Sequence, residues 1–358
     1  MEKNSLVNDL WSSDARLSSQ VWYGMNVATR FILLKRWGIE PTVDHQFKTV
    51  RAQQLAHFLE GVSKLGLSDE PHPQLCAKYH AISNLLGGYD VGYRDDGDRA
   101  WIYYFPPNSY AGGPMLPTPA MPASPQEVLE ADFRAWHANN GVLLANDRLQ
   151  FVLTDLLLLG GPFDAGYWHC ADRPLAEHER FVKALGRERR APGELPQFNI
   201  ADWPIERRDS ALRKYTAQYA LGGIVEIAKA RGMEEAADIA QQSHQTTMLA
   251  WCRTLVDRWE LASMPPTKRL AALFERCWRL LGDDLQQTTD GRDVLLTHRT
   301  KVKVFSTLGY EAIPRPIEVA IATAWTTLSL CLGDRVEVTT EPAQSGGASH
   351  SHWRFHQR

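Results

Sequence analysis

The spacing of hydrophobic residues alternates along the chain between a helical period and the strict alternation of a β-strand. Turn residues separate the two patterns, as in the DDGD turn between two alternating stretches, which predicts a β-hairpin. In the first half the pattern predicts helices at 19–37, 47–65, 73–86 and about 125–144, and strands at 89–94, 99–105, 149–158 and 165–170. The order helix, helix, helix, hairpin, helix, hairpin indicates an α+β fold.

The same order of patterns returns in the second half. It predicts helices at 210–231, 234–260, 266–281 and 315–332, a hairpin within 287–308, and strands at 334–341 and 349–356. Matching residues keep their order, for example Gly38 with Gly232, Leu55 with Leu249, Trp136 with Trp325, Asp147 with Asp334 and Trp168 with Trp353. This self-similarity indicates a tandem duplication, with chance similarity of common patterns as the alternative. We expect a first copy at 1–172, a linker at 173–207 and a second copy at 208–358, with antiparallel sheets covered by helices and a pseudo-two-fold relation between the copies.

Two segments do not fit this pattern of helices and strands. The stretch 106–125 is rich in Pro and Gly, which excludes regular structure. Connections of this length in a compact domain are often lids or binding loops, or else disordered. We predict that it covers a cavity in the first copy. The basic run GRERRAPGELP at 186–196 lies between the copies and is interpreted as a solvated linker.

The composition excludes several classes of function. The 358 residues have a net charge of −3, which argues against the clustered Lys and Arg of a nucleic-acid footprint. No apolar run is long enough to span a bilayer, and the N-terminus lacks the apolar run of a signal peptide. The 5 Cys are scattered without a CxxC pair, which fits a reducing cytoplasm. We expect a cytoplasmic protein that binds a small molecule and neither nucleic acid nor membrane; a homodimer is left open.

The helix before the first closing strand contains the leading candidate for chemistry. Phe133, Trp136 and Leu143 form an apolar stripe that must face the sheet. Asn140 interrupts this stripe and His137 borders it, and a polar group on a buried face needs a hydrogen-bond partner in the protein or in a ligand. We predict that His137 is a catalytic acid–base group and that Asn140 orients the substrate or the imidazole. The alternative is a His and an Asn whose hydrogen bonds are satisfied within the core.

The second copy has Thr326 and Ser329 at the corresponding helix positions. This is the pattern expected if one site of a duplicated pair kept its function and the other lost it. The first copy is therefore predicted to hold the working site. A sequence rich in Trp has either large cores, which is the interpretation for most of its Trp residues, or aromatic-lined pockets. We expect an aromatic pocket at the working site, with substrate-binding candidates Tyr89, Tyr93, Trp101, Tyr110 and Trp136.

Two further groups contain histidine. His80 is followed by Asp90, and a His with a carboxylate within reach forms an oriented catalytic base; a surface His beside a turn is the alternative. Near the C-terminus, His350 and His352 share one face of a strand and are candidate metal ligands, with a frayed, tag-like end as the alternative. The sequence contains no Gly-rich phosphate loop, HExxH or GxSxG motif, so no cofactor is predicted.

The predicted order of elements resembles that of a known ligand-binding fold. The relevant stretches are LCLGDRVEV (330–338), in which a helix runs through Gly-Asp into a strand, and the closing strand SHWRF (351–355). This order is similar to that of 4-vinyl-reductase-type domains, of the TRAPP vesicle-tethering subunits and of the aminothiazoline-carboxylate hydrolase family. The resemblance implies a two-layer α+β fold with a ligand cavity between helices and sheet, and it transfers no catalytic residue. The chain departs from these families in being duplicated, and it lacks the paired closing cysteines of many 4-vinyl-reductase-type domains.

Three functions are compatible with these features. The favoured one is an enzyme that uses acid–base chemistry on a small, partly apolar or aromatic molecule, as a hydrolase, lyase or isomerase without a nucleotide cofactor. It is favoured because the chain shows no DNA-binding or output domain and because the loop 106–125 can act as a lid. The alternatives are a non-catalytic small-molecule binding or sensor protein, and a scaffold or tethering protein, which would expose a large apolar patch.

Overall fold

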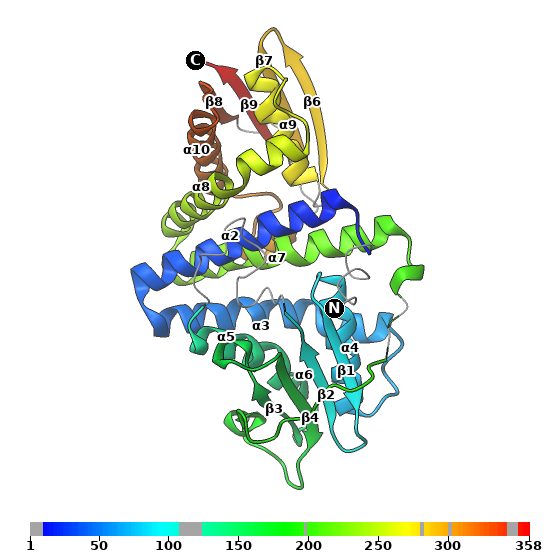
Figure 1. Cartoon of the computed structure of the whole chain (residues 1–358). Coiled ribbons are helices and arrows are strands. Elements are labelled where there is room, and N and C mark those ends of the chain that lie inside the picture. The colour runs from blue at the N-terminus through cyan, green and yellow to red at the C-terminus, as the bar shows by residue number, and fades with distance from the viewer. Residues whose placement is uncertain are drawn as a thin grey trace. The chain divides into compact units, whose positions relative to one another are not determined.

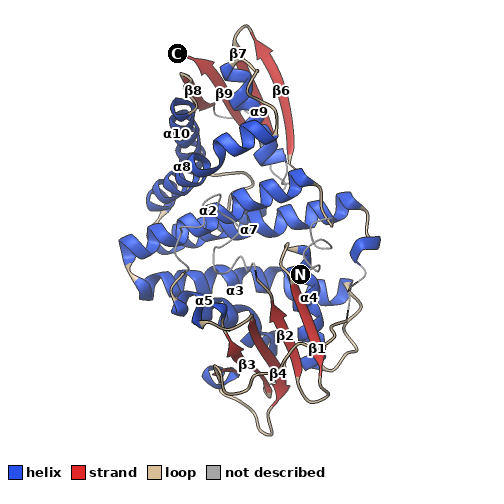
Figure 2. Ribbon diagram, in the orientation of Figure 1, coloured by secondary structure: helices blue, strands red, loops and turns tan. Residues whose placement is uncertain are grey.

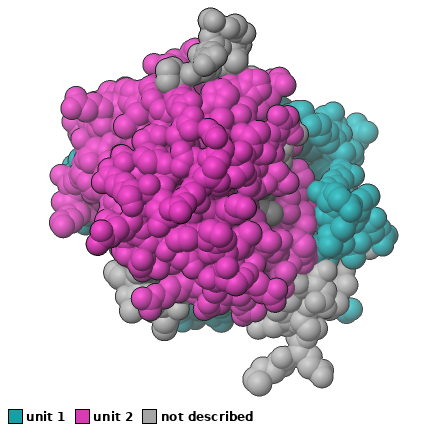
Figure 3. Space-filling model, turned by 90° about the horizontal axis from the view of Figure 1, so that it is seen from above, with its two compact units in different colours: residues 1–10, 37–114, 121–208 teal, residues 11–36, 115–120, 209–358 magenta. Residues whose placement is uncertain are grey.

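The computed structural model describes residues 10–106, 124–196, 198, 200–279, 283–299, 303–341 and 350–358 (Figure 1, Figure 2). Helices and mainly antiparallel sheets make up the chain, which confirms the predicted α+β class. The chain forms two compact units, coloured separately in Figure 3. Within the described residues, unit 1 is built mainly from 37–106 and 124–208, and unit 2 from 11–36 and 209–358. The segment expected to be a linker, 173–207, thus belongs to unit 1.

Unit 1 contains a five-stranded sheet of order β1-β2-β4-β3-β5. Its main elements are α3 (Ile39–Lys64), α4 (His72–Leu86), β1 (Val91–Asp95), β2 (Ala100–Tyr104), α5 (Gln126–Phe133), the π-helical turn η2 (Arg134–Ala138), α6 (Asn140–Leu143), β3 (Leu149–Asp155), β4 (Asp164–Cys170) and β5 (Phe181–Lys183), with short 3-10 turns η3 (Leu157–Leu159), η4 (Glu177–Arg180) and η5 (Ile200–Asp202). Neighbouring strands are antiparallel except β3 and β5, which are parallel. The helix α3 begins directly after Gly38, whose φ of 82° separates it from the preceding helix, so it starts before the predicted residue 47.

Unit 2 contains a four-stranded antiparallel sheet of order β6-β7-β9-β8. Its elements are α2 (Ser13–Trp37), α7 (Ile205–Arg231), α8 (Met233–Arg258), α9 (Pro266–Arg279), β6 (Asp284–Asp290), β7 (Asp293–Arg299), the 3-10 turn η6 (Lys303–Leu308), α10 (Arg315–Cys331), β8 (Val336–Glu341) and β9 (Ser351–Gln357). The helix α2, expected in the first copy, belongs to this unit. The indole N–H of Trp22 on α2 donates to the carbonyl of Cys277 at 3.3 Å. The ring of Trp22 packs edge-on against that of Trp278, with 4.9 Å between the ring centroids.

The order of elements is the same in the two halves of the sequence. The series α2, α3, α4, β1, β2, α5, β3, β4 recurs as α7, α8, α9, β6, β7, α10, β8, β9. The sheet order β1-β2-β4-β3 also recurs as β6-β7-β9-β8. This shared connectivity is what a tandem duplication requires, and the common origin of the two halves stays a prediction.

The first sheet is covered on both faces. Tyr104 of β2 faces the helices, because its hydroxyl contacts a residue of η2, and adjacent residues along a strand point to opposite faces. The opposite face carries an apolar cluster of Trp101, Tyr103, Val152, Ala165, Tyr167 and Ala184, against which Val182 and Leu195 pack. The interpretation of 186–196 as a solvated linker is therefore corrected. The chain from β5 to Leu195 covers this aromatic face, although most of its charged side chains remain exposed.

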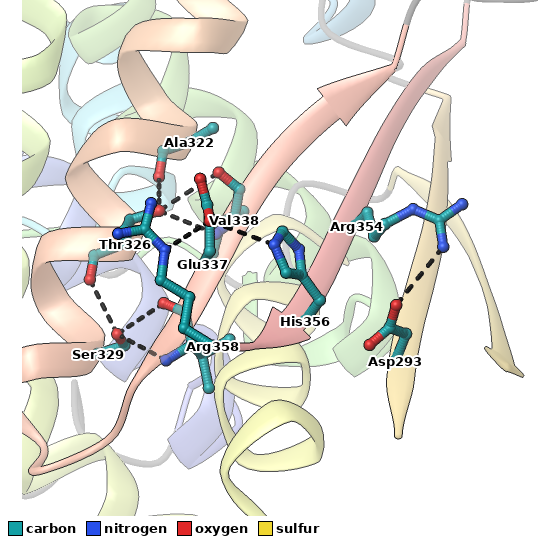
Figure 4. A network of polar contacts seen from close by, with 10 residues as sticks. Asp293, Ala322, Thr326, Ser329, Glu337, Val338, Arg354, His356 and Arg358 are labelled. Atoms are coloured by element: carbon teal, nitrogen blue, oxygen red, sulfur yellow. Dashed lines mark hydrogen bonds and ion pairs between the residues drawn. The ribbon is translucent and has the colours of Figure 1, made fainter. Parts of the chain in front are cut away.

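The free edge of the second sheet is closed by side chains of α10 (Figure 4). The hydroxyl oxygen of Ser329 accepts the N–H of Val336 at 3.2 Å, and that of Thr326 accepts the N–H of Val338 at 2.8 Å. Unpaired backbone groups on an edge strand invite pairing with another chain, and here the hydroxyls of a helix satisfy them. Thr326 and Ser329 were expected as remnants of a lost site; the structure shows them bonded to β8.

All five cysteines are free thiols. Cys76, Cys252 and Cys277 are buried, whereas Cys170 and Cys331 are exposed. Burial raises the pKa of the Cys277 thiol to about 12, so this group stays protonated at neutral pH. Among the described helices, none is both long enough and apolar enough to cross a membrane.

Candidate functional site

The predicted catalytic residues of the first half meet in the core of unit 1. His80 lies on α4, His137 on η2 and Asn140 at the start of α6, and all three side chains are buried. The two imidazole rings stack with 4.5 Å between their centroids. The sequence placed His80 in a separate candidate group. The fold unites the groups because α4 and η2 both pack on the same sheet.

A π-helical turn shapes this core. The helix predicted to run to about residue 144 divides into α5, η2 and α6. The carbonyl of His137 within η2 accepts the indole N–H of Trp168 at 3.1 Å. Such π turns occur frequently at functional sites. Gly141 lies four residues after His137, and an added Cβ there would clash with Nη1 of Arg180 and with the carbonyl oxygen of Asn146. Protein atoms therefore fill the space beside Gly141.

His137 is neutral and bonded to the sheet. Its Nε2 lies 2.9 Å from the hydroxyl oxygen of Tyr104, which also accepts a hydrogen bond from Asn84 at 3.2 Å. The Tyr104 hydroxyl is therefore assigned as donor to Nε2, which leaves the ring proton of His137 on Nδ1. Burial lowers the pKa of His137 to about 3, against an opposing hydrogen bond with the backbone of Phe133. The imidazole thus carries no charge at pH 7.

His80 is held by a chain of amides. Nδ2 of Asn140 donates to Nε2 of His80 at 2.7 Å, and Nε2 of Gln54 donates to Oδ1 of Asn140 at 2.6 Å. Nδ1 of His80 therefore carries the ring proton, and it has no hydrogen-bond partner among the described residues. Burial, assisted by the neighbouring His137, lowers the pKa of His80 well below its usual value, and the bond with Asn140 opposes this shift. Within the described part of the chain, neither imidazole is paired with a carboxylate that would stabilise a bound proton.

Two predicted substrate-binding residues border this core. The ring centroid of Trp136 lies 5.8 Å from that of His80, and the centroid of Tyr89 lies 6.5 Å from that of Tyr104. Both Trp136 and Tyr89 are buried. Neither His80 nor His137 lines the pocket at the β1–β2 turn or the pocket between α10 and β8. In unit 1 the polar groups are thus packed among aromatic rings.

The other predicted substrate-binding residues lie elsewhere. Trp101 points to the opposite face of the first sheet and does not meet His137. Tyr93 on β1 stacks against Phe198 with 5.3 Å between the ring centroids. Tyr110, with most of the loop 106–125, lies outside the described residues.

The remaining predicted pairings of histidine are not seen. Asp90 lies just before β1, where its backbone carbonyl accepts the N–H of Phe105 at 2.8 Å, while the ring of His80 bonds to an amide. The candidate metal ligands His350 and His352 lie at the start of β9. No group of three His, Cys, Asp or Glu side chains within the described ranges is arranged to hold a metal ion.

Unit 2 contains a second buried polar cluster, which sequence reasoning missed. Nε2 of His298 on β7 lies 2.7 Å from Oδ2 of Asp283, and both side chains are fully buried. Because an ionised carboxylate only accepts hydrogen bonds, Nε2 carries the ring proton and Nδ1 is left as an acceptor. This Nδ1 has no hydrogen-bond partner among the described residues. An imidazole oriented by a carboxylate is the arrangement of a catalytic base.

A buried carboxyl and a hydroxyl lie beside this pair. Ser351 on β9 is the cross-strand neighbour of His298, and its hydroxyl donates to the carboxylate of Glu318 on α10. Burial raises the pKa of Glu318, against the opposing effects of its bonds to Ser351 and Arg315 and of the nearby His298. The cluster therefore combines an oriented base with a carboxyl group that keeps its proton to a higher pH than usual.

The sequence did contain a signal for this cluster. The alternation of β7 places His298 on the same face as the apolar Val294 and Leu296, and Glu318 falls within the apolar pattern of α10. A polar residue on a buried face is the criterion that selected Asn140. The same criterion therefore also selects His298 and Glu318.

Comparison with known proteins gives no relative. No match to this chain was found among protein-family models, curated proteins or solved structures. The function is therefore argued from the geometry of the two buried clusters.

Proposed function

We propose that the protein is an enzyme that acts by acid–base chemistry on a small, partly apolar or aromatic organic molecule, as a hydrolase, lyase or isomerase. The observation that supports this most is the buried pair of His298 and Asp283, with the carboxyl group of Glu318 beside it. The proposal moves the working site from His137, where the sequence pattern put it, to the cluster in unit 2.

The choice between the two clusters rests on the partners of their imidazoles. An imidazole with a pKa of about 3 binds a proton too weakly to serve as an efficient base near pH 7, which is the situation of His137. His298 differs because a carboxylate oxygen of Asp283 lies 2.7 Å from its Nε2 and orients the ring. The histidines of unit 1 then serve to organise the core.

Each residue of the unit 2 cluster has a defined role in this proposal. Nδ1 of His298 accepts a proton from the substrate or from an attacking water, and Asp283 holds the ring and stabilises the imidazolium. Glu318 donates a proton to the leaving or rearranging group, and Ser351 orients its carboxyl. The ring of Trp278 lies 5.2 Å from that of His298 and supplies an apolar surface for the substrate.

The test compares matched glutamine variants of the full chain. We would screen small aromatic and aliphatic esters, amides and hydroxy acids in deuterated water, and follow product formation and deuterium uptake by NMR. His298→Gln and Glu318→Gln should lower turnover by about 10²- to 10⁴-fold, whereas His137→Gln should keep it. Normal turnover by a folded His298→Gln variant contradicts the assignment. A wild-type protein that converts nothing in the screen contradicts the enzymatic function and favours a binding protein.

A further inference from the structure

The outer face of the first sheet has a pocket with a volume of ≈ 580 Å³. Its lining comes from Asp96, Asp98 and Arg99 at the β1–β2 turn, from Trp101 of β2, and from residues 188–190 after β5. Trp101 belongs to the aromatic cluster on the sheet face opposite to the buried histidines. The pocket is thus separate from both polar clusters, and the proposed acid–base chemistry does not use it.

Two buried donors without a partner lie at this face. Trp101 is 3% exposed and Tyr103 is 0% exposed, and their rings stack with 6.2 Å between the centroids. Neither the indole nitrogen of Trp101 nor the hydroxyl of Tyr103 has a hydrogen-bond partner among the described residues. Burial raises the pKa of Tyr103, so its hydroxyl keeps its proton at neutral pH. Of these two residues, Trp101 lines the pocket, so an acceptor group of a molecule bound there is able to pair with its indole N–H.

The rim of the pocket holds both signs of charge in fixed positions. The guanidinium of Arg99 lies 4.7 Å from the centre of the Tyr167 ring and 3.0 Å from a carboxylate oxygen of Glu188. Glu188 also accepts the hydroxyl of Tyr167 at 2.7 Å, and Arg190 lies 3.0 Å from Asp96. These contacts limit how far the charged groups can move. The lining as a whole contains three guanidinium groups and three carboxylates.

We propose that this pocket binds a small zwitterion of the amino-acid class. A lining with equal numbers of positive and negative groups complements a ligand that carries both charges better than a simple anion or cation. The guanidinium groups and the Trp101 N–H face a carboxylate, for which Arg is the preferred partner, and Asp98 faces the ammonium. The volume falls within the range of about 300–1,000 Å³ that is typical of small-molecule pockets.

The test uses isothermal titration of the full chain with each standard L-amino acid at millimolar concentration. For L-phenylalanine, the controls are phenethylamine, which lacks the carboxylate, and 3-phenylpropionate, which lacks the ammonium. We expect at least one amino acid to bind, with analogues that lack either charge binding at least about tenfold more weakly. Arg99→Gln and Trp101→Phe should weaken binding to a similar extent. His352→Gln, on the outer face of the other sheet, is the matched control and should not change it.

Each alternative result overturns the proposal. If no amino acid binds, or if binding is unchanged in folded Arg99→Gln and Trp101→Phe variants, the pocket is not a zwitterion site. If the carboxylate-only analogue binds as tightly as the amino acid, the site is for anions. Arg99 is partly exposed at the rim, so its variant is expected to fold normally. His298→Gln should bind like wild type, so failure of the proposed catalytic function leaves this result interpretable.

Discussion

The two sheets have the same strand order but use their outer faces differently. Every residue of β2 in the first sheet is buried, because the chain after β5 covers the aromatic face that β2 presents. In the second sheet the burial of β7 alternates, and the outer face is polar. There Arg354 lies 3.7 Å from Asp293, and His356 lies 3.2 Å from Glu337 (Figure 4). Two sheets with the same connectivity can therefore differ in which faces are buried. In the first sheet, the chain from β5 to Leu195 buries the outer face, and the second sheet lacks such a cover among its described residues.

The two candidate clusters differ in the partners of their histidines. In unit 1, His80 and His137 bond to neutral amide and hydroxyl groups, and burial keeps both uncharged. In unit 2, His298 bonds to the carboxylate of Asp283. A neutral network fixes a core, whereas an imidazole paired with a carboxylate is equipped to exchange protons.

The largest expected effect concerns the matched tryptophans Trp168 and Trp353. Both are 0% exposed, and replacement by Ala should cost about 3–5 kcal/mol in each case. Replacement by Phe is expected to have different effects on stability at the two positions. The indole of Trp168 donates to the carbonyl of His137, whereas the indole nitrogen of Trp353 has no partner in the described part of the chain. Trp168→Phe should therefore cost about 1 kcal/mol more than Trp353→Phe, measured by urea unfolding. Equal losses would show that the bond to His137 adds no stability.

The pH dependence of stability tests the neutral histidines of unit 1. His137 has a folded-state pKa of about 3, below its unfolded value of about 6.5, so the unfolded chain binds a proton that the folded chain does not. Above about pH 6.5, His137 makes no contribution to the pH dependence of stability. As the pH falls from about 6.5 toward 3, its titration lowers the free energy of unfolding by about 1.4 kcal/mol per pH unit. His137→Gln should flatten the fall in unfolding free energy between pH 6.5 and 4, measured with urea. An unchanged slope would mean that His137 titrates normally.

An intermediate loss of stability is expected when the covered edge of β8 is disturbed. Thr326→Val leaves the buried N–H of Val338 without its acceptor, and we expect a loss of about 1–3 kcal/mol and faster hydrogen exchange at that amide. Thr327→Val is the matched control, because the hydroxyl of Thr327 bonds only within its own helix, to the carbonyl of Thr323. If the Val338 amide exchanges at a similar rate in both variants, the hydroxyl of Thr326 does not protect this edge. In the first sheet β5 occupies the equivalent edge, at β3.

The smallest effects are expected on the outer face of the second sheet. His352→Ala and Arg354→Gln should change the free energy of unfolding by no more than about 0.5–1 kcal/mol, because both side chains are partly exposed and the ion pair of Arg354 with Glu341 is weakened by solvent. The comparison is Tyr167→Ala on the outer face of the first sheet, which removes a buried ring and should cost several-fold more by thermal unfolding. A comparable loss at His352 would mean that this face is covered in solution.

The sequence by itself determined the elements of this protein and their order. Helical and alternating spacing are local properties, so they located nearly every helix and strand, and they placed Asn140 and His137 on a buried face before any contact was known. The recurring order of elements was visible for the same reason. The extra strand β5 was missed because three residues in a charged, Pro-rich stretch produce no recognisable period.

Tertiary structure alone decided which of these elements meet. The packing of α2 within unit 2, the bond between His80 and Asn140, and the pairing of Asp283 with His298 all join segments predicted as separate elements. No local period encodes such a contact, because it depends on how whole faces are buried against one another. The lowered pKa values of His80 and His137 follow from their burial, and the contact between His298 and Asp283 follows from the packing of β7, so the chemistry of the candidate sites was fixed at this last step.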